Sequence, residues 1–68
     1  MFEVKIMTAG DAFRDTSVVN RKGEHPLDGC GSEVRRLLSY VSACIEVGIN
    51  DGVLRDVNGN KVGEWRYE

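Results

Sequence analysis

The chain has 68 residues, 41% of them hydrophobic and 29% charged, which suits one small domain and is too apolar for a disordered chain. Eleven acidic and nine basic residues give a net charge of −2, which argues against a basic nucleic-acid binder. No apolar run approaches the roughly 18 residues of a membrane span, and the sequence shows no signal-peptide pattern. We therefore expect a cytoplasmic protein that contacts no membrane.

The first expected element is a strand over residues 2–8. Phe2, Val4 and Ile6 alternate with Glu3 and Lys5, and this period of two is typical of a half-buried strand. The two opposite charges then share the solvent-facing side of the strand.

Residues 9–31 form a long loop without sustained periodicity. Such a stretch is uncommon in a compact domain and is usually functional or partly mobile. We expect Phe13 to anchor a short helical turn against the core and residues 16–20 to form a short edge strand. His25-Pro26 and Asp28-Gly29 are expected to form turns.

A helix over residues 32–47 is the clearest element. Apolar side chains recur there at the i, i+3, i+4, i+7 spacing of an amphipathic helix; they are Val34, Leu37, Leu38, Val41, Cys44 and Ile45. The polar residues predicted for the opposite face are Glu33, Arg35, Arg36, Ser39, Ser42 and Glu46. Ser32 is the expected N-cap, and Gly48 suits the left-handed position after the helix.

A β-hairpin is expected over residues 52–67, because Asn58-Gly59 between two extended runs is the strongest short-range hairpin signal. Two registers fit this turn. Asp56 faces Lys61 if the loop has two residues, or Asn60 if a three-residue turn ends in a bulge at Gly59.

The second register also sets Leu54 opposite Val62, which gives the helix two apolar side chains to cover, and we favour it for that reason. It places Trp65 and Tyr67 on the other face of the hairpin. With the first strand beside the hairpin, the element order predicts one α+β domain over residues 1–68, a small antiparallel sheet packed on one amphipathic helix.

The residues that usually carry chemistry form no recognisable constellation. His25 is the single histidine, and the two cysteines have no further pair to complete a metal site. Cys30 lies just before the helix, where a thiolate would be stabilised, but an ordinary loop thiol is the favoured interpretation. We therefore expect no catalytic residue, no metal site, no cofactor and no enzymatic activity.

Two stretches of the chain carry a resemblance to a known family. They are Thr8–Asp15, which resembles T-x-x-A-F-x-D with one more residue after the threonine, and Gly52–Trp65, which reads G-x-L-x-D-x-N-G-N-x-V-G-x-W. Both are similar to a family of short proteins encoded by bacteriophages, prophages and conjugative elements. That family has no established reaction, so the resemblance implies a small accessory protein of a mobile element and transfers no site residue.

Size, composition and resemblance together favour a non-enzymatic protein that binds a host protein or protein complex, for example an inhibitor of a host defence system such as an anti-CRISPR. A domain this small can cover a functional surface of roughly 800 Å² on its partner. Basic and aromatic side chains in the loop, helix and hairpin are the candidate contacts. They are Phe13, Arg14, Arg35, Arg36, Arg55, Trp65 and Arg66.

Two alternatives belong to other functional classes. One is an oligomeric module for a small ligand or nucleotide, which binds a phosphate at Gly29–Ser32 and stacks a base on Trp65 or Tyr67. It requires a homodimer or larger assembly, because one short chain cannot enclose a pocket of several hundred Å³. The other is a structural or assembly accessory protein. Nucleic acid is disfavoured as a partner by the net charge.

Overall fold

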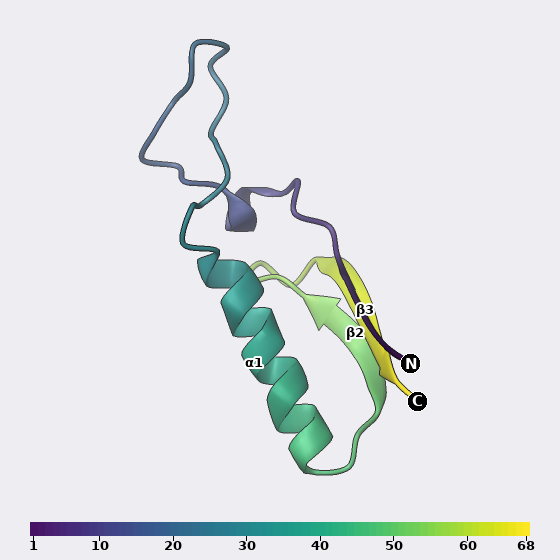
Figure 1. The fold of residues 1–68 in the computed structure, drawn as a ribbon. Helices are drawn as coiled ribbons and strands as arrows, with labels where there is room; N and C mark the ends of the chain where they lie inside the picture. The colour runs from purple at the N-terminus through teal and green to yellow at the C-terminus, as the bar shows by residue number, and fades with distance from the viewer.

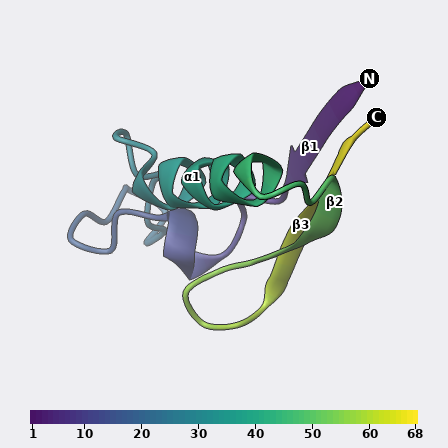
Figure 2. The ribbon, with the colours of Figure 1, turned by 90° about the horizontal axis from the view of Figure 1, so that it is seen from below.

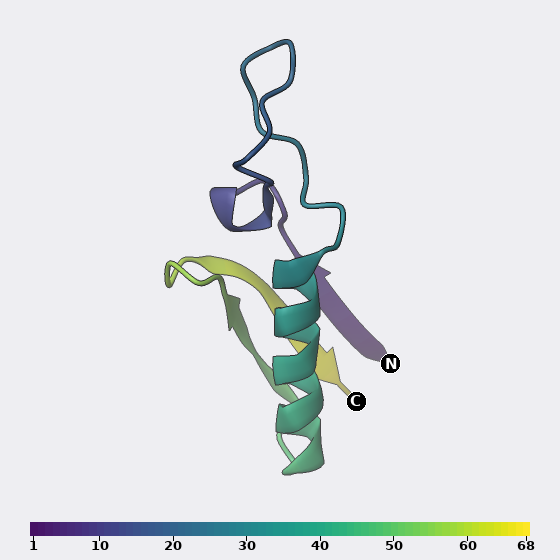
Figure 3. The same ribbon diagram turned by 90° about the vertical axis from the view of Figure 1, so that its left-hand side faces the viewer.

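The computed structural model describes residues 1–68 as one helix on one face of a three-stranded antiparallel sheet (Figures 1 and 3). The strands are β1 (Phe2–Ile6), β2 (Asp51–Arg55) and β3 (Lys61–Tyr67), in the order β1-β3-β2. The helix α1 spans Ser32–Glu46, and a 3-10 turn, η1, spans Asp11–Phe13. The expected α+β fold class is confirmed. No helix has the length and apolar character needed to cross a bilayer.

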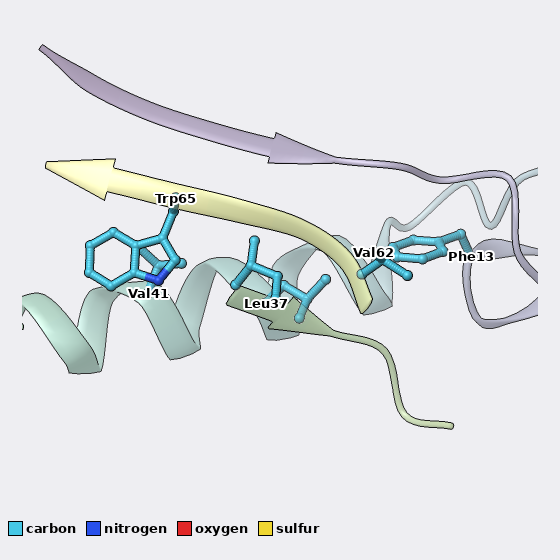
Figure 4. Close-up of a cluster of buried hydrophobic side chains, with 6 residues drawn as sticks. Phe13, Leu37, Val41, Val62 and Trp65 are labelled. Carbon is cyan, nitrogen blue, oxygen red and sulfur yellow. The ribbon is translucent and has the colours of Figure 1, made fainter. Parts of the chain in front are cut away.

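Six side chains from η1, α1 and the hairpin form the core. They are Phe13, Leu37, Val41, Leu54, Val62 and Trp65. Figure 4 shows the indole of Trp65 over Val41, Leu37 farther along α1, and Phe13 beside Val62. The prediction that Phe13 anchors a helical turn against the core is confirmed, since its side chain is 3% exposed.

A β-bulge sets the register of the hairpin. At the turn, the amide of Asp56 donates to the carbonyl of Asn60 at 2.9 Å, as the favoured register predicts. One step farther along, Leu54 faces Gly63, because Val62 is an extra residue in β3. The predicted pairing of Leu54 with Val62 is therefore wrong, although both side chains reach the core.

The bulge also decides where Trp65 lies. Side chains of a strand alternate between its faces, so a one-residue shift moves every later side chain to the other face. Trp65 is consequently 3% exposed and packs under α1, and its predicted place on the outer face is wrong. Gly52 stands opposite Trp65, and a Cβ there would lie only 2.8 Å from the indole nitrogen. The glycine leaves room for the ring.

The two ends of α1 differ in how well the sequence predicted them. Gly48 adopts φ +91°, and the amide of Ile49 donates to the carbonyl of Cys44 at 2.9 Å, so the predicted left-handed C-terminal glycine is confirmed. Ser32 is not the N-cap. That position belongs to Gly31, at φ +60°, and the Asp28 carboxylate accepts the amides of Cys30, which precedes the helix, and of Ser32, its first residue.

The apolar stripe of α1 is narrower than its sequence suggests. Leu37 and Val41 are 2% exposed, whereas Leu38, expected in the core, is 46% exposed. Glu33, expected on the solvated face, is 6% exposed. The sheet is only three strands wide, so α1 buries the line of residues that faces it and leaves one flank of the stripe in contact with water.

This contrast gives a matched pair of variants. Leu37→Ala should lower the free energy of unfolding by about 2–5 kcal/mol, because it opens a cavity in the core. Leu38→Ala, with the same change of side chain, should cost roughly 1 kcal/mol, since half of that leucine already contacts water. Chemical denaturation of the two variants measures the difference. Equal losses would contradict the observed orientation of the helix.

Candidate functional site

The seven predicted contact residues do not form one surface. Phe13 and Trp65 belong to the core, so their side chains are inaccessible to a partner. Arg35 is exposed on α1, and Arg66 is exposed on the sheet face turned away from the helix. Arg14 lies half-buried at the point where the long loop leaves the domain. The remaining two, Arg36 and Arg55, meet at the hairpin turn.

A polar clamp made by Glu33 and Arg36 joins the first turn of α1 to the hairpin. One oxygen of the buried Glu33 carboxylate accepts the amide of Val57 at 2.9 Å, and the other is paired with the Arg36 guanidinium. Arg36 in turn donates from Nη2 to the carbonyl of Arg55 at 3.0 Å. These contacts join segments that are far apart in sequence, so the clamp serves the fold.

The same contacts tune the Glu33 carboxyl. Its pKa is lowered from the ordinary value of 4.5, first by the hydrogen bond from Arg36 and also by the amide of Val57. A carboxyl with a lowered pKa in the folded state stabilises the protein above its unfolded-state pKa, and this contribution is lost as the pH falls through the folded-state value.

We therefore predict a specific pH dependence for Glu33→Gln. The difference in unfolding free energy between wild type and variant should be largest above about pH 5 and should shrink as the pH falls below 4.5. Glu46→Gln, at an exposed position of the same helix, is the control and should leave the pH profile close to that of wild type. Parallel profiles for wild type and Glu33→Gln would contradict the clamp.

The outer sheet face, turned away from α1, carries charges of both signs around a shallow hollow. Its exposed side chains are Glu3, Lys5, Asp51, Val53, Glu64 and Arg66. The strand register sets Arg66 between Glu3 and Asp51, and Glu64 beside Lys5. Neighbouring charges therefore compensate one another, and exposed pairs of this kind contribute little stability. The face offers no concentrated charge to a ligand.

The long loop projects from the domain as an arm, defined here as residues 14–28 (Figures 1 and 3). An antiparallel bridge between Arg14 and Leu27 closes its base, and the amide of Asp15 donates to the carbonyl of Pro26 at 2.8 Å. The molecule measures 45 × 22 × 15 Å with a radius of gyration of 13.6 Å, against about 11 Å for a compact chain of this length. The arm accounts for the elongated shape.

Hydrogen bonds within the arm give it a defined path. At its tip, the amide of Asn20 donates to the carbonyl of Glu24 at 2.8 Å, and the Asn20 side chain accepts two further amides. Nearer the base, His25 Nδ1 lies 2.7 Å from the carbonyl oxygen of Val18. Neither the edge strand predicted over residues 16–20 nor the turn predicted at His25-Pro26 is formed, while the turn at Asp28-Gly29 is confirmed.

The arm exposes apolar side chains that the fold does not use. Val18 and Val19 are 46% and 59% exposed, and Arg21 and Lys22 follow them at the exposed tip. Neither valine belongs to the core or packs against it. The length of this segment marks it in the sequence, but the candidate contact residues do not include the two valines, which lie in the predicted edge strand over residues 16–20.

The helix entry, considered for phosphate, is occupied by the protein itself. The carboxylate of Asp28 accepts the amides of Cys30 and Ser32 at 3.1 and 3.2 Å, and these bonds, that of Cys30 first, lower the pKa of Asp28. A negative charge there opposes a phosphate. No three His, Cys, Asp or Glu side chains gather where they could hold a metal ion, and Cys30 and Cys44 are free thiols.

Comparison of the chain with protein-family models, with curated proteins and with solved structures found no match in any of the three. Its function is therefore inferred from the chemistry of its own surface. The arm is a surface feature that the packing of the core does not explain.

Proposed function

We propose that this protein acts by binding a macromolecule through its arm, without catalysing a reaction. The observation that carries the proposal is a hydrogen-bonded loop that exposes Val18 and Val19 away from the core. Loops of this length in a compact domain are usually functional or mobile, and the hydrogen bonds within the arm favour a functional, binding element. An ordered loop also loses less conformational entropy on binding than a flexible one.

The chain is large enough to act by covering a functional surface of its partner. An ordinary interface takes roughly 800 Å² from each partner, which is about one-sixth of the 5073 Å² accessible surface of this chain. The arm is narrow enough to enter a groove of a larger protein, with the two valines as apolar contacts. Arg21 and Lys22 at the tip favour an acidic rim around that groove.

The resemblance to short proteins of bacteriophages and other mobile elements supports a bacterial host protein as the partner. A small binding protein can inhibit a host defence system, such as a CRISPR complex, by covering its functional surface without catalysing a reaction. This is the specific function that we propose. The nucleotide-binding alternative has less support, because Asp28 occupies the helix entry and Trp65 is buried.

The experiment is capture of host proteins with the purified chain, using two matched variants. Val18→Asp combined with Val19→Asp should weaken capture of the specific partner roughly tenfold or more, because buried charges replace apolar contacts. Val53→Asp is the control, since Val53 is 45% exposed on the outer sheet face. Melting temperatures close to wild type should show that the arm variant is folded.

The expected partner is a defence component, so expression of wild type, but not of the arm variant, should restore phage growth in a host whose CRISPR system is active. Capture that is equal for wild type and the arm variant would contradict the role of the arm. A chain that captures no macromolecule would contradict the proposed function as a whole.

A further inference from the structure

The free edge of the sheet at β1 presents unpaired backbone groups. Met1 and Glu68 exchange backbone hydrogen bonds, and the amide of Met7 donates to the carbonyl of Val62 in β3. Antiparallel pairing alternates, so Glu3 and Lys5 also point their backbone groups at β3. The N–H and C=O groups of Phe2, Val4 and Ile6 therefore point outward, where a further strand could bind.

Apolar side chains accompany this edge. Phe2 is 52% exposed, and Val4 and Ile6 are only partly buried, because α1 packs over β2 and β3. Figure 2, seen from below, shows β1 extending past α1 toward the two chain termini. The first strand thus combines open hydrogen-bonding groups with apolar surface that the helix does not cover.

We propose that two copies of this chain associate through antiparallel pairing of their β1 strands, centred on Val4. In this register Val4 faces the partner's Val4, and Phe2 faces the partner's Ile6. These are the three residues whose backbone groups point outward, so each of those groups gains a partner. The two sheets become one, and the inference goes beyond the binding function of the arm.

The charges of β1 select this register. Glu3 then faces the partner's Lys5 in a non-hydrogen-bonded pair, where opposing side chains are closest. Within a single chain, Glu3 and Lys5 form an ion pair at 2.9 Å on the outer sheet face. A shift of two residues would set Glu3 opposite the partner's Glu3, or Lys5 opposite the partner's Lys5, and like charges in direct opposition are unfavourable.

The other edge of the sheet is less open. At β2, Nη2 of Arg36 already donates to the carbonyl of Arg55, which the alternation of hydrogen bonds places on the outward edge. The Arg36 guanidinium therefore blocks one end of β2. Leu54 of β2 is buried in the core, so it offers no apolar surface to a further strand. Pairing through β1 is therefore favoured over pairing through β2.

Charge reversal tests the proposal without reference to the arm. Sedimentation velocity of the wild-type chain should show a dimer. Lys5→Glu and Glu3→Lys should each weaken self-association roughly tenfold or more, because both cross-strand pairs become like-charged. An equimolar mixture of the two variants should restore a dimer, since each strand then faces its opposite charge. A monomeric wild type, or variants that each dimerise as wild type does, would overturn the proposal.

A second pair of variants tests the hydrogen bonds. Val4→Pro removes an N–H that points away from β3, so the β1–β3 ladder keeps its bonds, whereas Val4→Ala removes the side chain and keeps the N–H. The Val4→Pro variant should be monomeric, and the Val4→Ala variant should still dimerise. The two variants should have the same circular dichroism spectrum, which shows that both are folded. Dimers formed equally by both variants would overturn pairing through this edge.

Discussion

Packing of the Trp65 indole against α1 is the contact on which the rest of the structure depends. Only six apolar side chains are buried in the core, and Trp65 is the largest of them. The bulge at Val62 turns Trp65, Leu54 and Val62 toward the helix together. Without it, alternation would send the indole to the outer face, and the core of this small domain would lose its largest side chain.

Two glycines make this arrangement sterically feasible. Gly52 leaves space for the indole, and Gly63 allows β1 to approach the central strand, since a Cβ there would lie 1.8 Å from the carbonyl oxygen of Lys5. The clamp between Glu33 and the amide of Val57 then ties the helix to the hairpin turn that follows β2.

Local patterns predicted the elements of the fold, and contacts across the chain decided what those patterns missed. The helical spacing of apolar residues and the Asn58-Gly59 turn signal act within a few residues, so α1 and the hairpin were predictable. The bulge was not, because the alternation of β3 suits either register. The predicted burial of Leu38 and exposure of Glu33 were wrong for a related reason. Both depend on tertiary structure, namely the width of the sheet and the position of the Val57 amide.

The candidate site was less predictable than the fold. Residue type alone singled out Phe13 and Trp65, which the core uses, and Arg36, which the clamp uses. Loop length did point to the arm, but the exposure of Val18 and Val19 depends on its path. The arm and the free edge of β1 are separate surfaces, so the proposed partner binding and the proposed self-association can be tested independently.

Fluorescence of the single tryptophan tests the central packing most directly. Burial of Trp65 under α1 predicts an emission maximum well to the blue of free tryptophan and strong protection from quenching by iodide, both lost on unfolding. Emission like that of free tryptophan in the folded chain, with full access to iodide, would place the indole on the outer face and contradict the bulged register.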